Sequence, residues 1–273
     1  MRSKILGVMS QKGGVGKTTI AVNLAVSLRL TGYEVLVIDL DTSNPSVGIH
    51  LGMHESGDGV EAFLNGHKGM KEFVSVHAPS GLHVMQGSID SPQYNLTELG
   101  AHKLKKEIER AAYDFVIIDT PPGPASKEIA NVLIDDAMIV TTPDLPSCTS
   151  AFKISERIDR INKHHSLVIN KKRGKSYEIS ERAIRAEYKG RIYGVIAEDE
   201  RVLASIGTHI PAVLLYCNIP FSRSINRIAE DYTRDNSSVQ RNAKSIDTRK
   251  GNLYSLFSGI FKRGRNQWRK KGI

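Results

Sequence analysis

The ten residues from Ser10 to Thr19, which read SQKGGVGKTT, constrain this chain more than any other stretch. They follow an apolar run at residues 5–9 and precede apolar residues at helical spacing over residues 20–28. This order predicts a buried strand, a glycine-rich loop and a helix. Because glycine has no Cβ, the backbone N–H groups of such a loop can close around an anion, and the helix directs its positive end toward the same place. The stretch therefore predicts a phosphate-binding loop.

Two side chains of this loop have the positions that nucleotide chemistry needs. Lys17 lies where its ammonium reaches the β- and γ-phosphates, and Thr18 lies where its hydroxyl ligates Mg²⁺. The generic pattern has a glycine where this chain has Gln11, and it lacks the extra lysine, Lys12. A glycine-rich turn with incidental lysines is the alternative, which the number of matching positions disfavours. The residues expected to bind the nucleotide here are Gly13, Gly14, Val15, Gly16, Lys17, Thr18 and Thr19.

The segment KGGVGKTT resembles the deviant Walker A motif of the MinD/ParA family of P-loop ATPases. The resemblance implies ATP and Mg²⁺ as cofactors and an ATP-dependent homodimer, in which Lys12 reaches the nucleotide of the partner subunit. It implies that Lys12 and Lys17 both act in catalysis, because both neutralise charge on the phosphates. Gln11 is more typical of ParA-like members, whereas many MinD-like members have glycine at this position.

Two acids follow the next expected strand, in the sequence EVLVIDLD over residues 34–41. The carboxyl ends of parallel strands meet in the crevice where open α/β sheets bind ligands, and residues two apart point to the same side. By the resemblance, Asp41 is the catalytic residue that orients or activates the attacking water, and Asp39 supports Mg²⁺ through water. A pair of solvated acids at a strand end is the alternative.

A third acid, Asp119, ends the apolar run FVII and is followed by TPPG. This is a Walker B pattern, in which the carboxylate binds Mg²⁺ directly or through a water. An apolar run that ends in an acid is common in proteins. The pattern gains its weight from the phosphate-binding loop upstream and from the likeness of DTPPG to the second switch of the family. The expected metal ligands are Thr18, Asp39 and Asp119.

Asn170 ends another expected strand, at residues 166–170, where members of the family have an asparagine for the adenine amino group. A turn-forming role is the alternative for a single asparagine at a strand end. Residues 192–200 resemble the family's G-x-I-P-x-D segment, but Ala197 replaces the proline, so we assign no adenine contacts there. His50 and the other histidines of residues 50–83 lack the spacing of metal ligands, and we expect surface or packing positions for them.

The chain alternates expected strands and helices, which predicts an α/β fold with a doubly wound, mostly parallel sheet flanked by helices. We expect a P-loop ATPase domain at residues 1–234, a polar flexible linker at 235–250 and a basic amphipathic helix at 251–273. No apolar run is long enough to span a membrane, and the N-terminal residues do not read as a signal peptide. The two cysteines are far apart and form no CxxC motif. We therefore expect a cytoplasmic protein without a cysteine metal site.

The positive charge is concentrated at the end of the chain. The formal net charge is +9, and residues 241–273 contain ten lysines and arginines but one acid, so the preceding residues carry basic and acidic side chains in equal number. On a helix, the apolar residues between positions 253 and 268 share an arc of about 160°. The cations Lys262, Arg263, Arg265, Arg269 and Lys270 lie outside this arc. A helix of this kind binds at an anionic membrane surface. The expected membrane contacts are Leu253, Leu256, Phe257, Ile260, Phe261, Lys262 and Arg263.

This ending resembles the MinD-like members of the family, which end in an amphipathic membrane-targeting helix. The resemblance implies an ATP-hydrolysing switch that is dimeric and bound to the inner face of the cell membrane with ATP, and cytoplasmic after hydrolysis. Hydrolysis is expected to be slow until a protein activator stimulates it, and the expected role is spatial regulation, such as division-site placement or the control of flagella or another surface structure. The alternatives are a ParA-like DNA-partitioning ATPase with a nucleic-acid-binding tail, a metal-cluster carrier or metabolic ligase of the same fold, and a final helix that docks on the domain.

Overall fold

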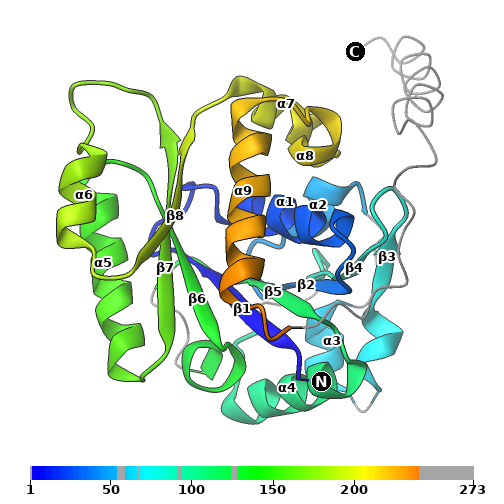
Figure 1. Ribbon diagram of the computed structural model, residues 1–273. Helices are drawn as coiled ribbons and strands as arrows, with labels where there is room; N and C mark the ends of the chain where they lie inside the picture. Colours follow the sequence, from blue (N-terminus) through cyan, green and yellow to red (C-terminus); the bar gives the residue numbers. More distant parts are fainter. Residues whose placement is uncertain (1, 54–58, 67, 91–93, 124–127, 240–273) are drawn as a thin grey trace, which may run out of the picture. The chain divides into compact units, whose positions relative to one another are not determined.

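The computed structural model describes residues 2–53, 59–66, 68–90, 94–123 and 128–239 (Figure 1). Met1–Asn242 form one compact unit, to which all of these residues belong. The expected membrane helix at 251–273, and the expected linker beyond residue 239, lie outside the described residues. In the part of the chain that the structure describes, no helix is both long enough and apolar enough to cross a membrane.

An eight-stranded sheet in the order β3-β4-β2-β5-β1-β6-β7-β8 forms the centre of this unit. Every neighbouring pair is parallel except β3 and β4 at one edge, so the predicted doubly wound, mostly parallel sheet is confirmed. The strands are β1 (Lys4–Met9), β2 (Val35–Asp39), β3 (Ser75–His77), β4 (Leu82–Met85), β5 (Phe115–Asp119), β6 (Asp136–Thr141), β7 (His164–Lys172) and β8 (Arg191–Ala197).

Helices cover both faces of this sheet (Figure 1). One layer contains α1 (Lys17–Leu30), α2 (Val47–Leu51), α7 (Glu200–Gly207), α8 (Ala212–Leu215) and α9 (Pro220–Asp235). The other contains α3 (Val60–Asn65), α4 (Glu98–Ala111), α5 (Leu145–Arg160) and α6 (Glu181–Glu187), together with a 3-10 turn at Met70–Phe73 and a π-helical turn at Ile129–Leu133.

The central strands divide their side chains between two cores, one on each face of the sheet. In β1, Leu6 and Val8 pack in the core that contains α1 and α9, whereas Ile5 and Met9 pack in the core that contains α4 and α5. Continuous apolar strands of this kind are typical of a parallel sheet that is covered on both sides. The polar residues that follow these apolar runs therefore emerge together at the carboxyl edge of the sheet.

Candidate functional site

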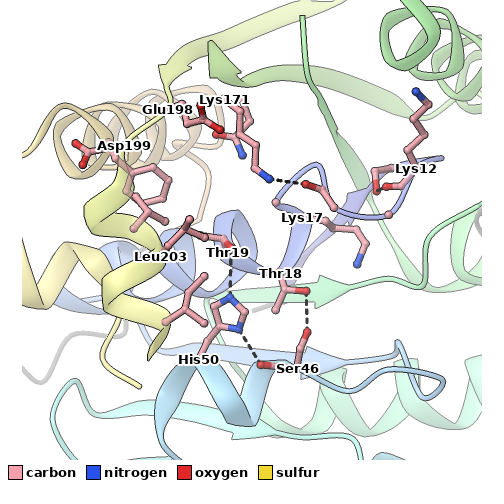
Figure 2. Close-up of a pocket in the computed structure, with 18 of the residues that line it drawn as sticks. Lys12, Lys17, Thr18, Thr19, Ser46, His50, Lys171, Glu198, Asp199 and Leu203 are labelled. Carbon is pink, nitrogen blue, oxygen red and sulfur yellow. Dashed lines mark hydrogen bonds between the residues drawn. The ribbon is translucent and has the colours of Figure 1, made fainter. Parts of the chain in front are cut away.

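The carboxyl edge of the sheet borders a pocket of about 490 Å³, within the usual range for small-molecule sites (Figure 2). The loop after β1 and the start of α1 form one wall, the loop after β2 with α2 forms another, and the end of β7 with α7 completes it. Val15, Asp39 and Asp119 are buried and lie outside the lining. The other residues that the sequence predicts line the pocket, namely Lys12, Gly13, Gly14, Gly16, Lys17, Thr18, Thr19, Asp41 and Asn170.

The glycine-rich loop joins α1 at Gly16, whose φ of +92° lies in the left-handed region that glycine adopts without strain. A Cβ atom at this position would lie 2.4 Å from Nδ2 of Asn170. That nitrogen donates a hydrogen bond to the carbonyl of Val15 at 2.8 Å, and Nζ of Lys171 donates to the carbonyl of Gly14 at 2.6 Å. The end of β7 therefore holds the loop and leaves room only for glycine at the start of α1.

Asn170 both lines the pocket and makes a hydrogen bond that holds the glycine-rich loop. Its amide nitrogen is engaged by the glycine-rich loop, whereas the amino group of an adenine would need the amide oxygen as an acceptor. The two contacts use different atoms, so one side chain can make both. Recognition of adenine by Asn170 stays a prediction.

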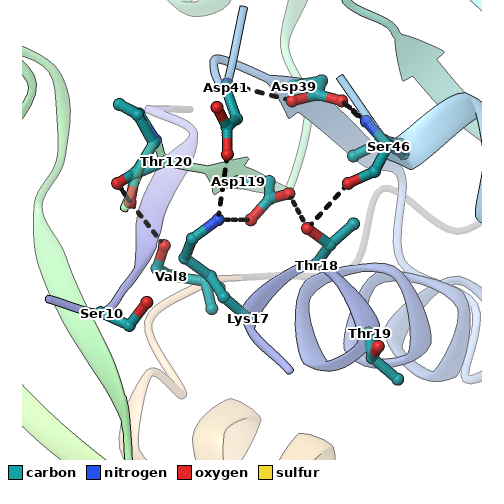
Figure 3. Close-up of polar contacts among 12 residues, drawn as sticks. Val8, Ser10, Lys17, Thr18, Thr19, Asp39, Asp41, Ser46, Asp119 and Thr120 are labelled. Atoms are coloured by element: carbon teal, nitrogen blue, oxygen red, sulfur yellow. Dashed lines mark hydrogen bonds and ion pairs between the residues drawn. The ribbon is translucent and has the colours of Figure 1, made fainter. Parts of the chain in front are cut away.

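Lys17 and Thr18, the first residues of α1, reach the acid that ends β5 (Figure 3). Nζ of Lys17 lies 2.9 Å from Oδ1 of Asp119 and 3.9 Å from Oδ2 of Asp41. Oγ1 of Thr18 donates a hydrogen bond to Oδ2 of Asp119 at 2.5 Å. Burial raises the pKa of the Asp119 carboxyl, while the charge of Lys17 and the hydrogen bond from Thr18 lower it. An ammonium and a hydroxyl thus lie beside the pocket with a buried carboxylate behind them.

Asp39 occupies the position of β2 that pairs with Asp119 of β5, but its partners are different. Its Oδ2 accepts the backbone N–H groups of Ser46 at 2.8 Å and Val47 at 3.0 Å, and its Oδ1 accepts that of Asp41 at 3.0 Å. Burial and the neighbouring Asp119 raise the pKa of Asp39 to about 8, against the effect of these three donors. Asp39 therefore holds the loop after β2, and its support of Mg²⁺ through water stays a prediction.

The oxygen atoms around Thr18 fit a magnesium ion, which prefers hard oxygen ligands in an octahedral shell and keeps several waters. The Thr18 hydroxyl and the Asp119 carboxylate contact each other at the side of the pocket. Among the described residues, no group of three or more His, Cys, Asp or Glu side chains is arranged to hold a metal ion. A cation here would take most of its shell from phosphate oxygens and water, which is the usual pattern for Mg²⁺ bound with a nucleotide.

Lys12 lies at the rim of the pocket and points away from Lys17 (Figure 2). Its Nζ is 3.4 Å from Oδ1 of Asp144, and both of these side chains are nearly half exposed. Partial burial raises the pKa of Asp144, but hydrogen bonds from Thr142 and Ser147 and the charge of Lys12 bring it down to about 2. Lys12 is thus paired with an acid of its own chain. Its contact with the nucleotide of a partner subunit stays a prediction.

Two residues of the segment after β2, Ser46 and His50, line the pocket, although the sequence predicts no binding role for either of them. Nε2 of His50 lies 3.2 Å from Oγ1 of Thr19, and Nδ1 lies 2.9 Å from the carbonyl oxygen of Ser46. His50 therefore packs against α1, which is one of the two positions expected for it, and it also lines the pocket. A short helix after a strand-end acid has no spacing that reveals such a contact, because the path of the loop alone brings the ring to α1.

The remaining wall comes from the segment that precedes α7 and from α7 itself. Residues 197–200 line the pocket even though Ala197 replaces the expected proline, so they form a wall that the sequence motif does not predict. The helix adds apolar side chains, of which Leu203 is 68% exposed and therefore free to cover a ligand. The apolar residues of α7 on the pocket are Val202, Leu203 and Ile206.

Comparison with known proteins agrees with the motifs. Residues 3–172, more than half of the chain, match the model of the AAA domain family. An uncharacterized ATP-binding protein of Methanocaldococcus jannaschii is 28% identical over 229 residues, which are 82% of this chain and 85% of that protein. An iron-sulfur cluster carrier protein of Pyrococcus abyssi is 33% identical over 152 residues, which are 50% of this chain and 51% of the carrier.

Solved structures share the fold. The septum site-determining protein MinD of Pyrococcus horikoshii, complexed with Mg-ADP, gives a TM-score of 0.77 at 22% identity and covers 87% of this chain and 99% of its own. A ParA family ATPase of Chlorobium tepidum gives a TM-score of 0.71 at 22% identity and covers 84% of this chain and 98% of its own. At these identities the likeness concerns the fold, which both structures share over most of the described residues.

Proposed function

This chain belongs to the AAA domain family of P-loop ATPases and has the fold of the MinD and ParA proteins, and we propose that it is an ATP-hydrolysing molecular switch. The observation that supports this most is the cluster of Lys17, Thr18 and Asp119 beside the pocket, with Asp41 on its wall. The cluster combines the cation, the hydroxyl and the carboxylates that phosphoryl transfer from a nucleotide uses.

In the proposed reaction, the protein contributes positioned charge more than covalent chemistry. Lys17 neutralises charge on the β- and γ-phosphates of ATP. A Mg²⁺ ion held by Thr18, and by Asp119 directly or through water, supplies further positive charge when bound. Asp41 accepts a hydrogen bond from the attacking water and orients it toward the γ-phosphate. The hydroxyl of Ser43 donates to Oδ1 of Asp41 at 2.7 Å and restricts that carboxylate.

ATP also drives dimer formation in this proposal. Lys12 leaves Asp144 and reaches the phosphates bound by the partner subunit. The exchange costs little, because the pair of Lys12 and Asp144 is nearly half exposed and such pairs contribute at most about 1 kcal/mol. Each site then has two lysines on its phosphates, which stabilises the transition state further. A protein activator or effector raises the slow basal rate.

The dimer presents two copies of the basic segment at residues 251–273 to an anionic membrane. Each cation near such a surface contributes about 1 kcal/mol, and the apolar side chains of the segment insert at the interface. Two linked segments bind more tightly than one, so that dimerisation couples ATP binding to membrane binding. After hydrolysis, the monomer returns to the cytoplasm.

Spatial regulation, such as division-site placement, is the cellular role that suits a switch of this kind, and the MinD of Pyrococcus horikoshii is a septum site-determining protein. DNA partitioning is the second candidate. It is favoured by the fold that this chain shares with a ParA family ATPase and by the ten cations of residues 241–273, which suit a phosphate backbone. Binding of duplex DNA at physiological salt would favour the second role over the first.

Nucleotide-dependent dimerisation tests the switch. We expect the purified chain, 30.1 kDa as a monomer, to double its mass in light scattering with ATP and Mg²⁺ and to stay monomeric with ADP. Asp41→Asn should trap the dimer, because ATP binds while hydrolysis falls about a hundredfold. Lys12→Ala should bind ATP and remain monomeric. A chain that hydrolyses no ATP, or that has the same mass with ATP and ADP, contradicts the proposal.

A further inference from the structure

The loop after β2 places a second hydroxyl, that of Ser46, beside Thr18 (Figure 3). We propose that Ser46 is a ligand of the Mg²⁺ that Thr18 holds, so that metal binding fixes the loop that carries Asp41. The inference rests on the proposed function, because it needs a nucleotide and a metal in the pocket. It adds to that function a physical link between the metal site and the water-orienting acid.

The distance between the two hydroxyls supports this assignment. Oγ of Ser46 lies 3.1 Å from Oγ1 of Thr18, and both residues line the pocket. Neighbouring ligands of an octahedral Mg²⁺ shell, each about 2.1 Å from the metal at a right angle, lie about 3 Å apart. The Thr18 hydroxyl already donates its proton to Asp119, so that its lone pairs face away from that carboxylate. The two oxygen atoms are thus spaced as two adjacent ligands of one ion.

The backbone of Ser46 is held on both sides, which makes its hydroxyl a defined ligand. Its N–H donates to Oδ2 of Asp39 at 2.8 Å, and its carbonyl oxygen lies 2.9 Å from Nδ1 of His50. A carbonyl can only accept, so Nδ1 of His50 carries the proton of this contact. The other ring nitrogen lies 3.2 Å from Oγ1 of Thr19. The backbone that carries the Ser46 hydroxyl is therefore fixed next to Thr18.

The same contacts explain why the metal would control the loop. Ser46 and Asp41 belong to one short segment, in which the N–H of Asn44 donates to the carbonyl of Asp41 at 3.0 Å. In the structure the hydroxyl of Ser46 donates to Thr18, a contact that a bound cation replaces by direct coordination. Two protein ligands from different elements then join α1 to the loop after β2. Loss of the Ser46 ligand therefore lowers the affinity for Mg²⁺ and also leaves the loop that carries Asp41 less restrained.

The affinity for Mg²⁺, measured apart from activity, tests the inference. With the fluorescent analogue mant-ATP, the Mg²⁺ concentration for half-maximal nucleotide binding should rise about tenfold in Ser46→Ala. The matched control is Thr42→Val, which removes a hydroxyl from the same loop that bonds the backbone of Tyr94 instead, and its Mg²⁺ dependence should match the wild type. Ser46→Cys should bind nucleotide poorly with Mg²⁺ and regain affinity with Cd²⁺, because a thiolate is a soft ligand.

The outcomes separate this inference from the proposed function. If the wild type binds mant-ATP with Mg²⁺, and Ser46→Ala shows the Mg²⁺ dependence of the wild type while melting at the wild-type temperature, Ser46 is no ligand and the inference fails alone. If Ser46→Cys responds to Cd²⁺ as the wild type does, the inference fails as well. If the wild type binds no nucleotide with any of these metals, the proposed function fails first.

Discussion

At the residue scale, the site is a small set of charges removed from water and balanced against one another. Lys17 is 7% exposed and pairs with Asp119, which has no exposed surface. A charge in such a place needs a partner, because the protein interior solvates it poorly. Three backbone N–H groups donate to Asp39, but its burial and the neighbouring Asp119 still raise its pKa to about 8. The local structure of α1 and of the ends of β2 and β5 therefore depends on the protonation of these acids and on the ion pair with Lys17.

Removal of the buried ammonium should therefore affect folding as well as nucleotide binding. Lys17→Met leaves Asp119 buried without its cation and should lower the free energy of unfolding by about 3 kcal/mol at pH 8. Burial raises the pKa of Asp119 and the charge of Lys17 lowers it, so removal of Lys17 raises this pKa further. Asp119 is then more readily protonated at pH 6, and the loss of unfolding free energy is smaller there than at pH 8. Urea unfolding of the variant and the wild type at both pH values measures this change in the free energy of unfolding.

The control for this variant is Lys171→Met. This lysine is more exposed and donates to a backbone carbonyl of the glycine-rich loop, so its removal leaves no buried carboxylate unpaired. We expect a change below about 1 kcal/mol at both pH values. An equal loss in the two variants, or a loss in Lys17→Met that grows as the pH falls, would show that the balance of charge around Asp119 is not as described.

At the element scale, the junction of the glycine-rich loop and α1 depends on a contact with β7. The carbonyl groups of Val15 and Gly14 accept from the side chains of Asn170 and Lys171. Both partners come from the end of a strand far along the chain, where the open sheet brings its carboxyl ends together. These contacts restrict the conformation of the loop, which lowers the cost of ordering it on binding.

A methyl group at the junction tests this arrangement. Gly16→Ala places a Cβ 2.4 Å from Nδ2 of Asn170, on a backbone with φ of +92°, and should destabilise the protein by about 2 kcal/mol. Gly13→Ala is the matched control, because a Cβ there meets nothing within 4 Å, and its stability should stay within about 0.5 kcal/mol of the wild type. Thermal melting without nucleotide compares the two. Equal melting temperatures for both variants would contradict the proposed packing of the junction.

The elements also show how far the sequence alone can predict this protein. The buried strands, the loop at Gly16 and the acids at strand ends follow local rules of periodicity and turn chemistry, and the parallel sheet follows from their order. Ser46 and His50 follow no such rule, because their roles depend on how a loop of irregular backbone crosses α1. The wall at residues 197–200 is hard to predict for a related reason. Ala197 breaks the expected motif, but the backbone still follows the path that lines the pocket.

At the scale of the whole molecule, the proposed switch joins two regions of opposite character. Residues 1–240 carry equal numbers of basic and acidic side chains and contain the pocket, whereas the whole net charge of +9 comes from residues 241–273. In this proposal, the neutral unit binds the nucleotide and controls dimerisation. The basic amphipathic segment then binds the dimer to the membrane surface. ATP-dependent membrane binding is therefore the central property of the proposed switch.

Co-sedimentation with anionic liposomes tests that claim most directly. The full chain and a chain that ends at Gly251 are each spun with vesicles in ATP, in ADP and without nucleotide. We predict that the full chain pellets with ATP several-fold more than with ADP, and that the shortened chain stays in the supernatant throughout while it still dimerises with ATP. A full chain that pellets under none of these conditions, or equally under all three, would contradict the membrane switch, and duplex DNA would then be the next ligand to measure.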